Sequence, residues 1–423
     1  MLGRATVASL DALQTMAKTV LAKATRARNP TVHDVQGHLA EWKALYDVLD
    51  TIQDPVAFHA HAIALEDAYS CDASTINFAA RVHQLHPMAF AQDTAMRRPP
   101  TSLQSTLSRC PHCGASIAPT TVFRLHLQQA LTVCHACHGR FDYDTYKLAA
   151  YIDAHPFCAV STTVVVDTPS LPRDGSWDTF LTLQAAAIRA TGPSQDAYNG
   201  AQMIQRRHML ASIRRSLNPA LSLDLVHGIF RQLRFLETIG SAYDYWNDAA
   251  VLTASIERYE RFMALTSPMP LVPTVDIDLV WHAHLTQPEH YARYCYRVRG
   301  AVLDHNDSKR SLLQSLERTR ALWQHAFNEP YTKLSSMTAV GTPVTEMPPS
   351  RWGTVLVPYN TTALVNRILL STAPTRKPQP SMDGTSGDHY LCDSSWPYYY
   401  QRRTTTEESE DASNSGSDGC SGD

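Results

Sequence analysis

The chain has 423 residues, and its 37 lysines and arginines nearly balance its 40 aspartates and glutamates, leaving a formal net charge of −3. That balance argues against a protein built mainly to coat DNA or RNA, because phosphate binding needs a clustered basic excess. Hydrophobic residues make up 44% of the chain, as in a globular protein, and since no run approaches roughly 18 consecutive apolar residues, we expect no membrane span.

The N-terminal segment, residues 1–30, is basic and allows two interpretations. Its five basic residues outnumber its single acid, a composition that a mitochondrial presequence can have. Its apolar residues also follow a helical spacing, and we favour a first amphipathic helix. The nine cysteines are an odd number with several isolated thiols, and no secretory apolar segment precedes them, which predicts a reducing compartment. We therefore expect a cytoplasmic or nuclear protein, with the mitochondrion as the alternative.

Most of the chain up to residue 337 shows the apolar spacing of helices. Side chains at intervals of three and four predict helices with one buried face. The clearest such stretches are 33–53, 219–240 and 248–266. In the second stretch, Asn218 suits the N-cap, Pro219 the first turn and Gly240 the end. We expect a helical region over 31–104 and a larger helical core over 146–337.

Two cysteine pairs within residues 105–145 are the strongest signal in the chain. Cys110 and Cys113 form one C-x2-C knuckle, and Cys134 and Cys137 form another after twenty intervening residues. Two such knuckles can close a tetrahedral shell of four thiolates around one zinc ion. Four protein ligands leave no open position for water, so we predict a zinc ribbon in which the metal is structural.

Other interpretations of the cysteines stay open. Cys134 and Cys137 followed by His138 also match the C-x-x-C-H pattern of covalent haem attachment, which would leave the first cysteine pair unexplained. An unmetallated or disulfide-bonded segment is a further alternative. The nearby histidines His112, His135 and His138 could replace one cysteine as a ligand.

A second candidate site lies in the segment from residue 273 to residue 307. Asp278 and His282 are four residues apart, so on a helix the carboxylate can orient the imidazole. His282 and His284 point about 200° apart on a helix, so both cannot bind one metal there. Thr286 and Glu289 resemble a capping box that opens the next helix.

These ionisable residues are the candidates for a catalytic or ligand role, beside a purely structural one. The candidates are Asp276, Asp278, His282, His284, Asp304 and His305. In the structural interpretation Asp276 caps a helix, Asp278 pairs with His282, and Trp281 fills the core. In the functional interpretation the dense ionisable groups beside tryptophan form a site.

The segment 338–423 is expected to be a linker and a largely disordered tail. From about residue 372 onward proline, serine, threonine and glycine dominate, and the end is acidic. Such a composition cannot bury enough apolar surface to offset the entropy of ordering. The predicted fold is therefore mainly α, a multi-helix bundle with a small inserted zinc ribbon and a disordered acidic C-terminal tail.

The run LVPTVDIDLVWHAHLTQPEHYARYC, together with DLVHGIFRQLRFLE before it, resembles the glycine-rich domain-containing protein-like (GRDP-like) family of plants and fungi. The two C-x2-C pairs are similar to those of fungal members, which suggests a fungal-type protein. The resemblance implies a mainly helical fold but no established reaction. It also suggests an internal duplication, which pairs Asn77 with Asp278, Arg81 with His282, His83 with His284 and Phe90 with Tyr291.

The predicted function is that of a zinc-containing helical interaction or regulatory module with a protein partner. No nucleophile motif, P-loop or dinucleotide fingerprint is present in the sequence, so we lean against an enzyme. The first alternative is a metal-dependent enzyme, such as an iron oxygenase, that uses Asp276, Asp278, His282 and His284 with a second metal of unknown identity. The second alternative is nucleic-acid binding through the arginines near the ribbon. These are Arg97, Arg98, Arg109, Arg124 and Arg140.

Overall fold

The computed structural model describes residues 29–52, 54–96, 98–159, 164–191, 217–265, 267, 271–305 and 312–331. The basic segment up to residue 28, Arg97 and the expected linker and tail over 338–423 lie outside the described residues. The described part is mainly helical, as the sequence predicts, with four short strands. None of its helices is long and apolar enough to cross a membrane.

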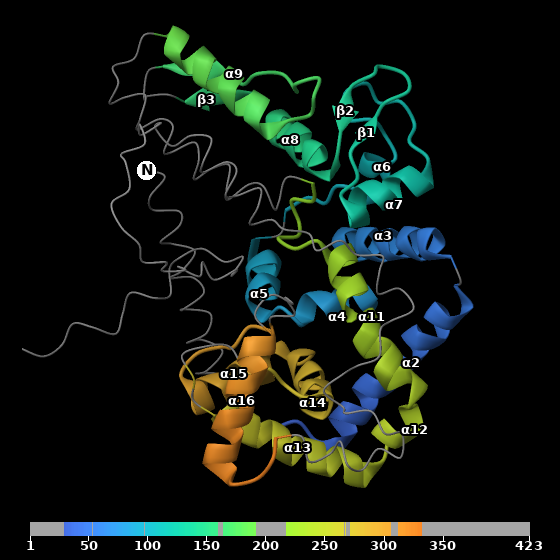
Figure 1. Cartoon of the computed structure of the whole chain (residues 1–423), viewed down its shortest axis with the longest axis vertical. Helices are drawn as coiled ribbons and strands as arrows, with labels where there is room; N and C mark the ends of the chain where they lie inside the picture. The colour runs from blue at the N-terminus through green and yellow to red at the C-terminus, as the bar shows by residue number, and fades with distance from the viewer. Residues whose placement is uncertain are drawn as a thin grey trace, which may run out of the picture. The chain divides into compact units, whose positions relative to one another are not determined.

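The helices up to residue 128 lead into the cysteine segment (Figure 1). They are α2 (Val32–Thr51), α3 (Pro55–Cys71), α4 (Phe78–Gln84), α5 (Pro87–Met96), α6 (Leu103–Leu107) and α7 (Pro119–Gln128). Thr31 forms a capping box with Asp34 at the start of α2, and the Asp54 carboxylate caps α3. These caps satisfy backbone N–H groups that have no partner inside a helix.

Two antiparallel hairpins interrupt the helices. One pairs β1 (Thr132–Val133) with β2 (Arg140–Phe141), and the other pairs β3 (Phe157–Ala159) with β4 (Val165–Asp167). The helices α8 (Tyr143–Ala154) and α9 (Trp177–Ala190) flank the second hairpin in the chain. Leu148 and Tyr151 of α8 pack with Trp177 and Phe180 of α9 in a small apolar cluster of their own.

The remaining helices complete the main core. They are α11 (Leu225–Ser241), α12 (Tyr243–Trp246), α13 (Ala249–Ala264), α14 (Val275–Leu285), α15 (Pro288–Arg299) and α16 (Leu312–Phe327). Helix α11 packs against α2, α3 and α4, while α14 packs against α2, α13 and α15 (Figure 1). One continuous apolar cluster joins these helices, from Val35 through the ribbon residue Phe141 to Tyr331. The ribbon therefore shares its core with the helices.

Two expected helix ends are wrong. Helix α11 begins at Leu225 and not at residue 219, because Asp224 is its N-cap and accepts from the backbone N–H of His227 at 2.9 Å. Asn218 caps only a turn, through the N–H of Ala220. The expected capping box at α15 is also missing, since the Thr286 hydroxyl donates backward to the Ala283 carbonyl.

The two halves of the suggested duplication each contain a similar set of side-chain contacts. The Tyr69 hydroxyl lies 3.0 Å from His83 Nδ1 between α3 and α4, and the Tyr259 hydroxyl lies 2.9 Å from His284 Nδ1 between α13 and α14. Phe90 packs edge-on against His83 with ring centroids 5.3 Å apart, and a tyrosine on α15 packs against His284 at the same 5.3 Å. The unit of two helices around a buried tyrosine and histidine is therefore present twice.

Candidate functional site

The four predicted zinc ligands lie together. The Sγ atoms of Cys110, Cys113, Cys134 and Cys137 are all within 4.8 Å of one another. In the first knuckle the N–H of Gly114 donates to the Cys110 carbonyl, and in the second the N–H of His138 donates to the Cys134 carbonyl, both at 2.9 Å. Gly114 has a φ of +73°, which suits a residue without a Cβ.

The sulfur distances fit one metal ion. Cys110 and Cys137 have their Sγ atoms 3.9 Å apart, and Cys113 and Cys134 have theirs 3.7 Å apart. Four sulfurs that lie about 2.3 Å from one tetrahedral zinc ion are about 3.8 Å from each other. Backbone N–H groups of the second knuckle lower the pKa of the Cys134 thiol to about 6, whereas burial raises the pKa of the Cys110 thiol to about 12. The cluster is compatible with a zinc site.

His112 holds the two knuckles together from outside the sulfur cluster. Its Nε2 atom lies 2.9 Å from the carbonyl oxygen of Arg140 on β2. A Cβ at Gly139 would lie 2.6 Å from the His112 ring, so glycine is needed there for close approach and not for a positive φ. His112 thus bridges the knuckles and lies outside the four-cysteine cluster.

The second candidate segment brings together three of its six predicted residues. Asp278 and His282 come from α14, and His305 comes from the segment after α15, where Gly300 ends the helix in a left-handed conformation. His305 Nε2 lies 3.1 Å from Asp278 Oδ1 and 3.1 Å from His282 Nε2, and the latter two atoms are 3.5 Å apart. We call these residues the Asp–His triad.

The other three candidates lie elsewhere. Asp276 is buried and accepts a 2.7 Å hydrogen bond from Arg258 Nε on α13, so it does not cap the helix. His284 faces Tyr259, away from the triad, and burial lowers its pKa to about 3. Asp304 is half-buried and outside the three-residue group. The predicted opposition of His282 and His284 on the helix is therefore present.

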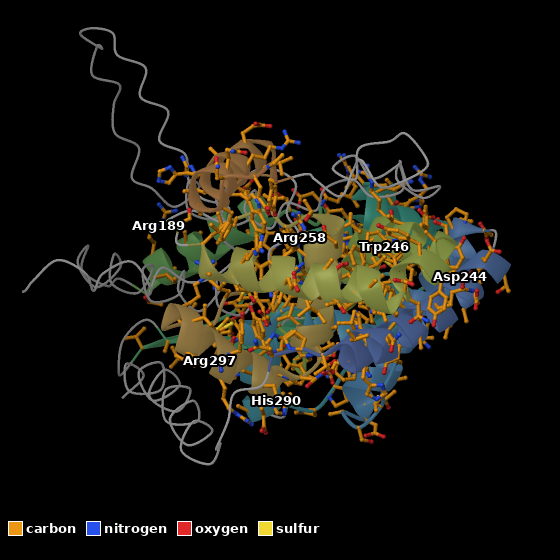
Figure 2. All side chains as sticks on the ribbon, turned by 90° about the horizontal axis from the view of Figure 1, so that it is seen from below. Arg189, Asp244, Trp246, Arg258, His290 and Arg297 are labelled. Atoms are coloured by element: carbon orange, nitrogen blue, oxygen red, sulfur yellow. The ribbon has the colours of Figure 1, made fainter. Side chains whose placement is uncertain are left out.

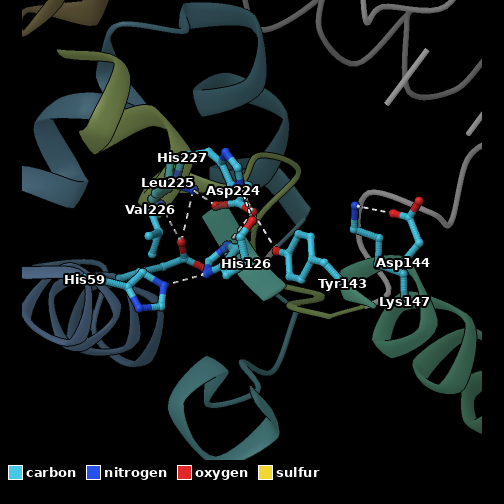
Figure 3. A network of polar contacts seen from close by, with 10 residues as sticks. His59, His126, Tyr143, Asp144, Lys147, Asp224, Leu225, Val226 and His227 are labelled. Atoms are coloured by element: carbon cyan, nitrogen blue, oxygen red, sulfur yellow. Dashed lines mark hydrogen bonds and ion pairs between the residues drawn. The ribbon is translucent and has the colours of Figure 1, made fainter. Parts of the chain in front are cut away.

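A third cluster, which the sequence did not reveal, joins α3, α7, α8 and α11 (Figure 3). Its chain of contacts runs from His59 Nε2 to His126 Nδ1 at 3.0 Å, and from His126 Nε2 to Asp224 Oδ2 at 2.9 Å. The Tyr143 hydroxyl donates to the same Asp224 oxygen at 2.6 Å, and His227 Nε2 lies 2.8 Å from the His126 carbonyl. The residues are far apart in sequence, so no local spacing could have indicated them.

This third cluster is fully accounted for by hydrogen bonds. With a hydrogen on Nε2 of each ring, His59 donates to His126, His126 donates to Asp224 and His227 donates to a carbonyl. These tautomers follow from the contacts. Glu66 extends the network by accepting from the first two backbone N–H groups of α11. We interpret the cluster as a structural network at the start of α11.

The comparisons with known proteins cover only part of the chain. Residues 196–293 match the family model of the glycine-rich domain-containing protein-like proteins, so the resemblance is confirmed for this region. The chain is 28% identical over 142 residues to Glycine-rich domain-containing protein 1 of Arabidopsis thaliana, and 30% identical over 141 residues to Glycine-rich domain-containing protein 2 of the same organism. Each alignment covers 30% of this chain but only 17% and 18% of the relatives. No solved structure matches the chain.

Proposed function

We propose that this GRDP-like protein is a zinc-containing interaction module. The observation that carries the proposal is the four-sulfur cluster of Cys110, Cys113, Cys134 and Cys137, whose distances suit one tetrahedral zinc ion. Because the protein supplies all four ligands, the ion stabilises the ribbon and takes no part in chemistry. Reduced thiolates of this kind suit the cytoplasm or the nucleus.

The ribbon holds apolar side chains out toward solvent. Leu131 and Val133 are 50% and 56% exposed, directly before the second knuckle, and two residues apart on an extended segment they share one face. Phe157 and Val165 on the following hairpin are 62% and 60% exposed. Exposed apolar groups on rigid elements favour contact with a protein partner. A zinc ion that fixes β1 would therefore fix part of the binding surface.

Metal analysis of the purified full-length protein tests the zinc. We expect the wild type to hold one zinc ion more than the Cys110→Ser, Cys137→Ser double variant, and the Cys71→Ser variant, at an exposed cysteine outside the cluster, to hold as much zinc as the wild type. Equal zinc content in the wild type and the double variant would refute this assignment.

Binding experiments test the surface separately. The Leu131→Ser, Val133→Ser variant should lose the protein partners that the wild type captures, while its zinc content stays the same. The matched control is Ile76→Ser, which changes an apolar side chain that is 77% exposed and lies outside the ribbon. If both variants capture the same partners as the wild type, the ribbon is not the binding surface.

A further inference from the structure

The Asp–His triad has a geometry that hydrogen bonds alone do not explain. An imidazole Nε2 atom carries either a hydrogen or a lone pair, and an ionised carboxylate only accepts. If only His305 carries the hydrogen and donates it to Asp278, the lone pairs of His282 and Asp278 face each other. If His282 carries a hydrogen as well, the N–H groups of His282 and His305 face each other. If only His282 carries the hydrogen, His305 and Asp278 face each other with lone pairs. Every such arrangement leaves one close contact without its own hydrogen, in contrast to the network around Asp224.

We infer that Asp278, His282 and His305 form a second metal site, for a divalent first-row transition-metal ion. A cation accepts the three lone pairs at once, which removes the conflict. Ligand atoms about 2.1 Å from one ion are about 3.0 Å apart in octahedral geometry and about 3.4 Å apart in tetrahedral geometry. The observed separations of 3.1, 3.1 and 3.5 Å lie at these values.

The surroundings fix the two imidazole rings in place. The His282 ring packs on Phe235 and Trp42 with centroid separations of 4.5 and 5.5 Å, and the His305 ring packs edge-on against Trp281 at 5.1 Å. The His282 and His305 rings are themselves 4.8 Å apart and 72° from parallel. Aromatic walls of this kind hold ligands in one orientation and limit the access of solvent to the ion on their side.

A fourth histidine lies beside the site. The ring of His38 on α2 is 6.4 Å from the ring of His282, and the residue is only 4% exposed. Among the described residues neither ring nitrogen of His38 has a hydrogen-bond partner, which is costly for a buried imidazole. A water or anion bound to the ion between the two rings would supply that partner. His38 therefore marks the side on which the ion has an open position.

The first copy of the helix unit shows that the fold does not need these ligands. At the positions that match Asp278 and His282, it has Asn77 and Arg81. Asn77 caps α4 through the N–H of Ala80 at 3.0 Å, and Arg81 donates to Glu41 at 2.6 Å. An amide and a guanidinium can build the same helix pair, whereas only the second copy has three metal-binding atoms together. The packing of the helices therefore does not require the metal-binding side chains of the triad.

The donor set selects the class of metal. Two imidazoles and one carboxylate suit Fe²⁺ or Zn²⁺, while Ca²⁺ and Mg²⁺ prefer oxygen ligands. Three protein ligands leave positions for other groups, as in catalytic metal sites, whereas the four-cysteine shell is closed. The site is independent of the proposed ribbon zinc, and the loss of either leaves the other intact.

Metal content of the full-length protein tests the site. Samples stripped with a chelator are dialysed separately against Zn²⁺, and against Fe²⁺ without oxygen, and then counted for metal. We expect the wild type to hold one ion more than His305→Ala in at least one of the two series, and Asp278→Asn to weaken that ion's binding by more than about tenfold. The control His284→Asn changes a buried histidine of the same helix and should hold as much metal as the wild type. Equal metal content of the wild type and His305→Ala with both ions would overturn the inference.

A second measurement covers the case in which a triad variant does not fold. The Cys110→Ser, Cys137→Ser variant keeps the triad and lacks the ribbon site, so its titration with Co²⁺ reports the triad alone. We expect a cobalt absorption spectrum without the thiolate charge-transfer bands that belong to the four-cysteine site. Absence of any Co²⁺ uptake by this variant, while its helical circular dichroism remains, would refute the second site and leave the ribbon proposal untouched.

Discussion

The buried ion pair between Arg258 and Asp276 fastens α13 to α14. Arg258, on α13 in Figure 2, donates at 2.7 Å both to Asp276 and to the carbonyl oxygen of Tyr331. Its guanidinium also lies 5.0 Å from the centroid of the Trp323 ring on α16. One charged side chain therefore joins three parts of the core, and its hydrogen bonds offset the cost of burying it.

Removal of one partner of the Arg258–Asp276 ion pair should strongly reduce the stability of the protein. Asp276→Asn leaves the guanidinium of Arg258 buried without its counter-charge, so we expect the free energy of unfolding to fall by about 3–5 kcal/mol. The control Glu317→Gln breaks the solvent-exposed pair with Arg320 and should cost less than about 1 kcal/mol. Urea unfolding of both variants checks this, and similar losses in the two would contradict it.

His227 should make stability depend on pH. Burial lowers the pKa of His227 to about 4, below the 6.5 of an ordinary histidine. Between these values the unfolded chain takes up a proton that the folded chain does not. Its contribution to stability is therefore fully present above pH 6.5 and is lost as the pH falls toward 4, by up to about 1.4 kcal/mol per pH unit.

The variant His227→Gln isolates this contribution. Glutamine can still donate to the His126 carbonyl but does not titrate, so its unfolding free energy should fall less steeply below pH 6.5. Urea unfolding at a series of pH values measures both slopes. Equal slopes in the wild type and the variant would mean that His227 does not contribute to the pH dependence.

At the residue level, the sequence predicts only those site contacts that follow from local spacing. The C-x2-C spacing indicated all four clustered cysteines, and the four-residue step from Asp278 to His282 indicated their proximity. His305 is also a candidate in the sequence, but its position next to α14 could not be predicted, because that contact depends on the path of the chain after α15. Asp276 is a candidate of the same segment or a helix cap in the sequence, yet in the structure it accepts a hydrogen bond from Arg258 on α13.

At the level of elements, α11 depends on two glycines that let neighbouring helices approach. A Cβ at Gly228 would lie 2.5 Å from Val82 on α4, and a Cβ at Gly240 would lie 2.3 Å from the Tyr46 ring on α2. The sequence suggested Gly240 only as a helix end. Its close contact is set by tertiary packing, which apolar periodicity does not describe.

Three alanine substitutions separate packing from helix propensity. Gly228→Ala and Gly240→Ala should each destabilise by about 1–3 kcal/mol, because overpacking outweighs the gain in propensity. An added Cβ at Gly37 in α2 would meet no atom of the described residues within 4 Å, so Gly37→Ala should stabilise by about 0.5–1 kcal/mol. Thermal unfolding of the three variants gives the order. A stabilising effect at all three positions would mean that α11 has room to move away from α2 and α4.

The start of α11 shows why helix ends were harder to predict than helices. The apolar stripe of this helix was evident, and its burial was predicted. Its first turn, however, is fixed by Asp224 and by Glu66 of α3, which accepts from the N–H groups of Leu225 and Val226. A capping side chain that comes from another helix cannot be predicted from the sequence around the helix start.

On the scale of the whole molecule, the ribbon and the helices form one packing unit. Helix α7 follows the first knuckle and packs on α3, and His126 on α7 bonds to His59 on α3 and to Asp224 before α11. The apolar spacing of the helical regions, taken alone, predicts that they fold independently of the zinc. The shared core instead predicts that the stability of the helices depends in part on the zinc, and that this dependence is greatest for the helices nearest the ribbon.

Zinc removal should therefore have graded consequences. With a chelator, or in the Cys110→Ser, Cys137→Ser variant, we expect amide hydrogen exchange to become fast over residues 105–145, because binding of a structural metal contributes directly to folding. Protection should fall to a lesser degree in α3 and in the first turn of α11, which bond to α7. Helices α13 and α14 should keep theirs, since they pack chiefly on each other and on α2. A uniform loss of protection would show one fully cooperative unit, and a loss limited to 105–145 would show that the contacts of α7 carry no coupling.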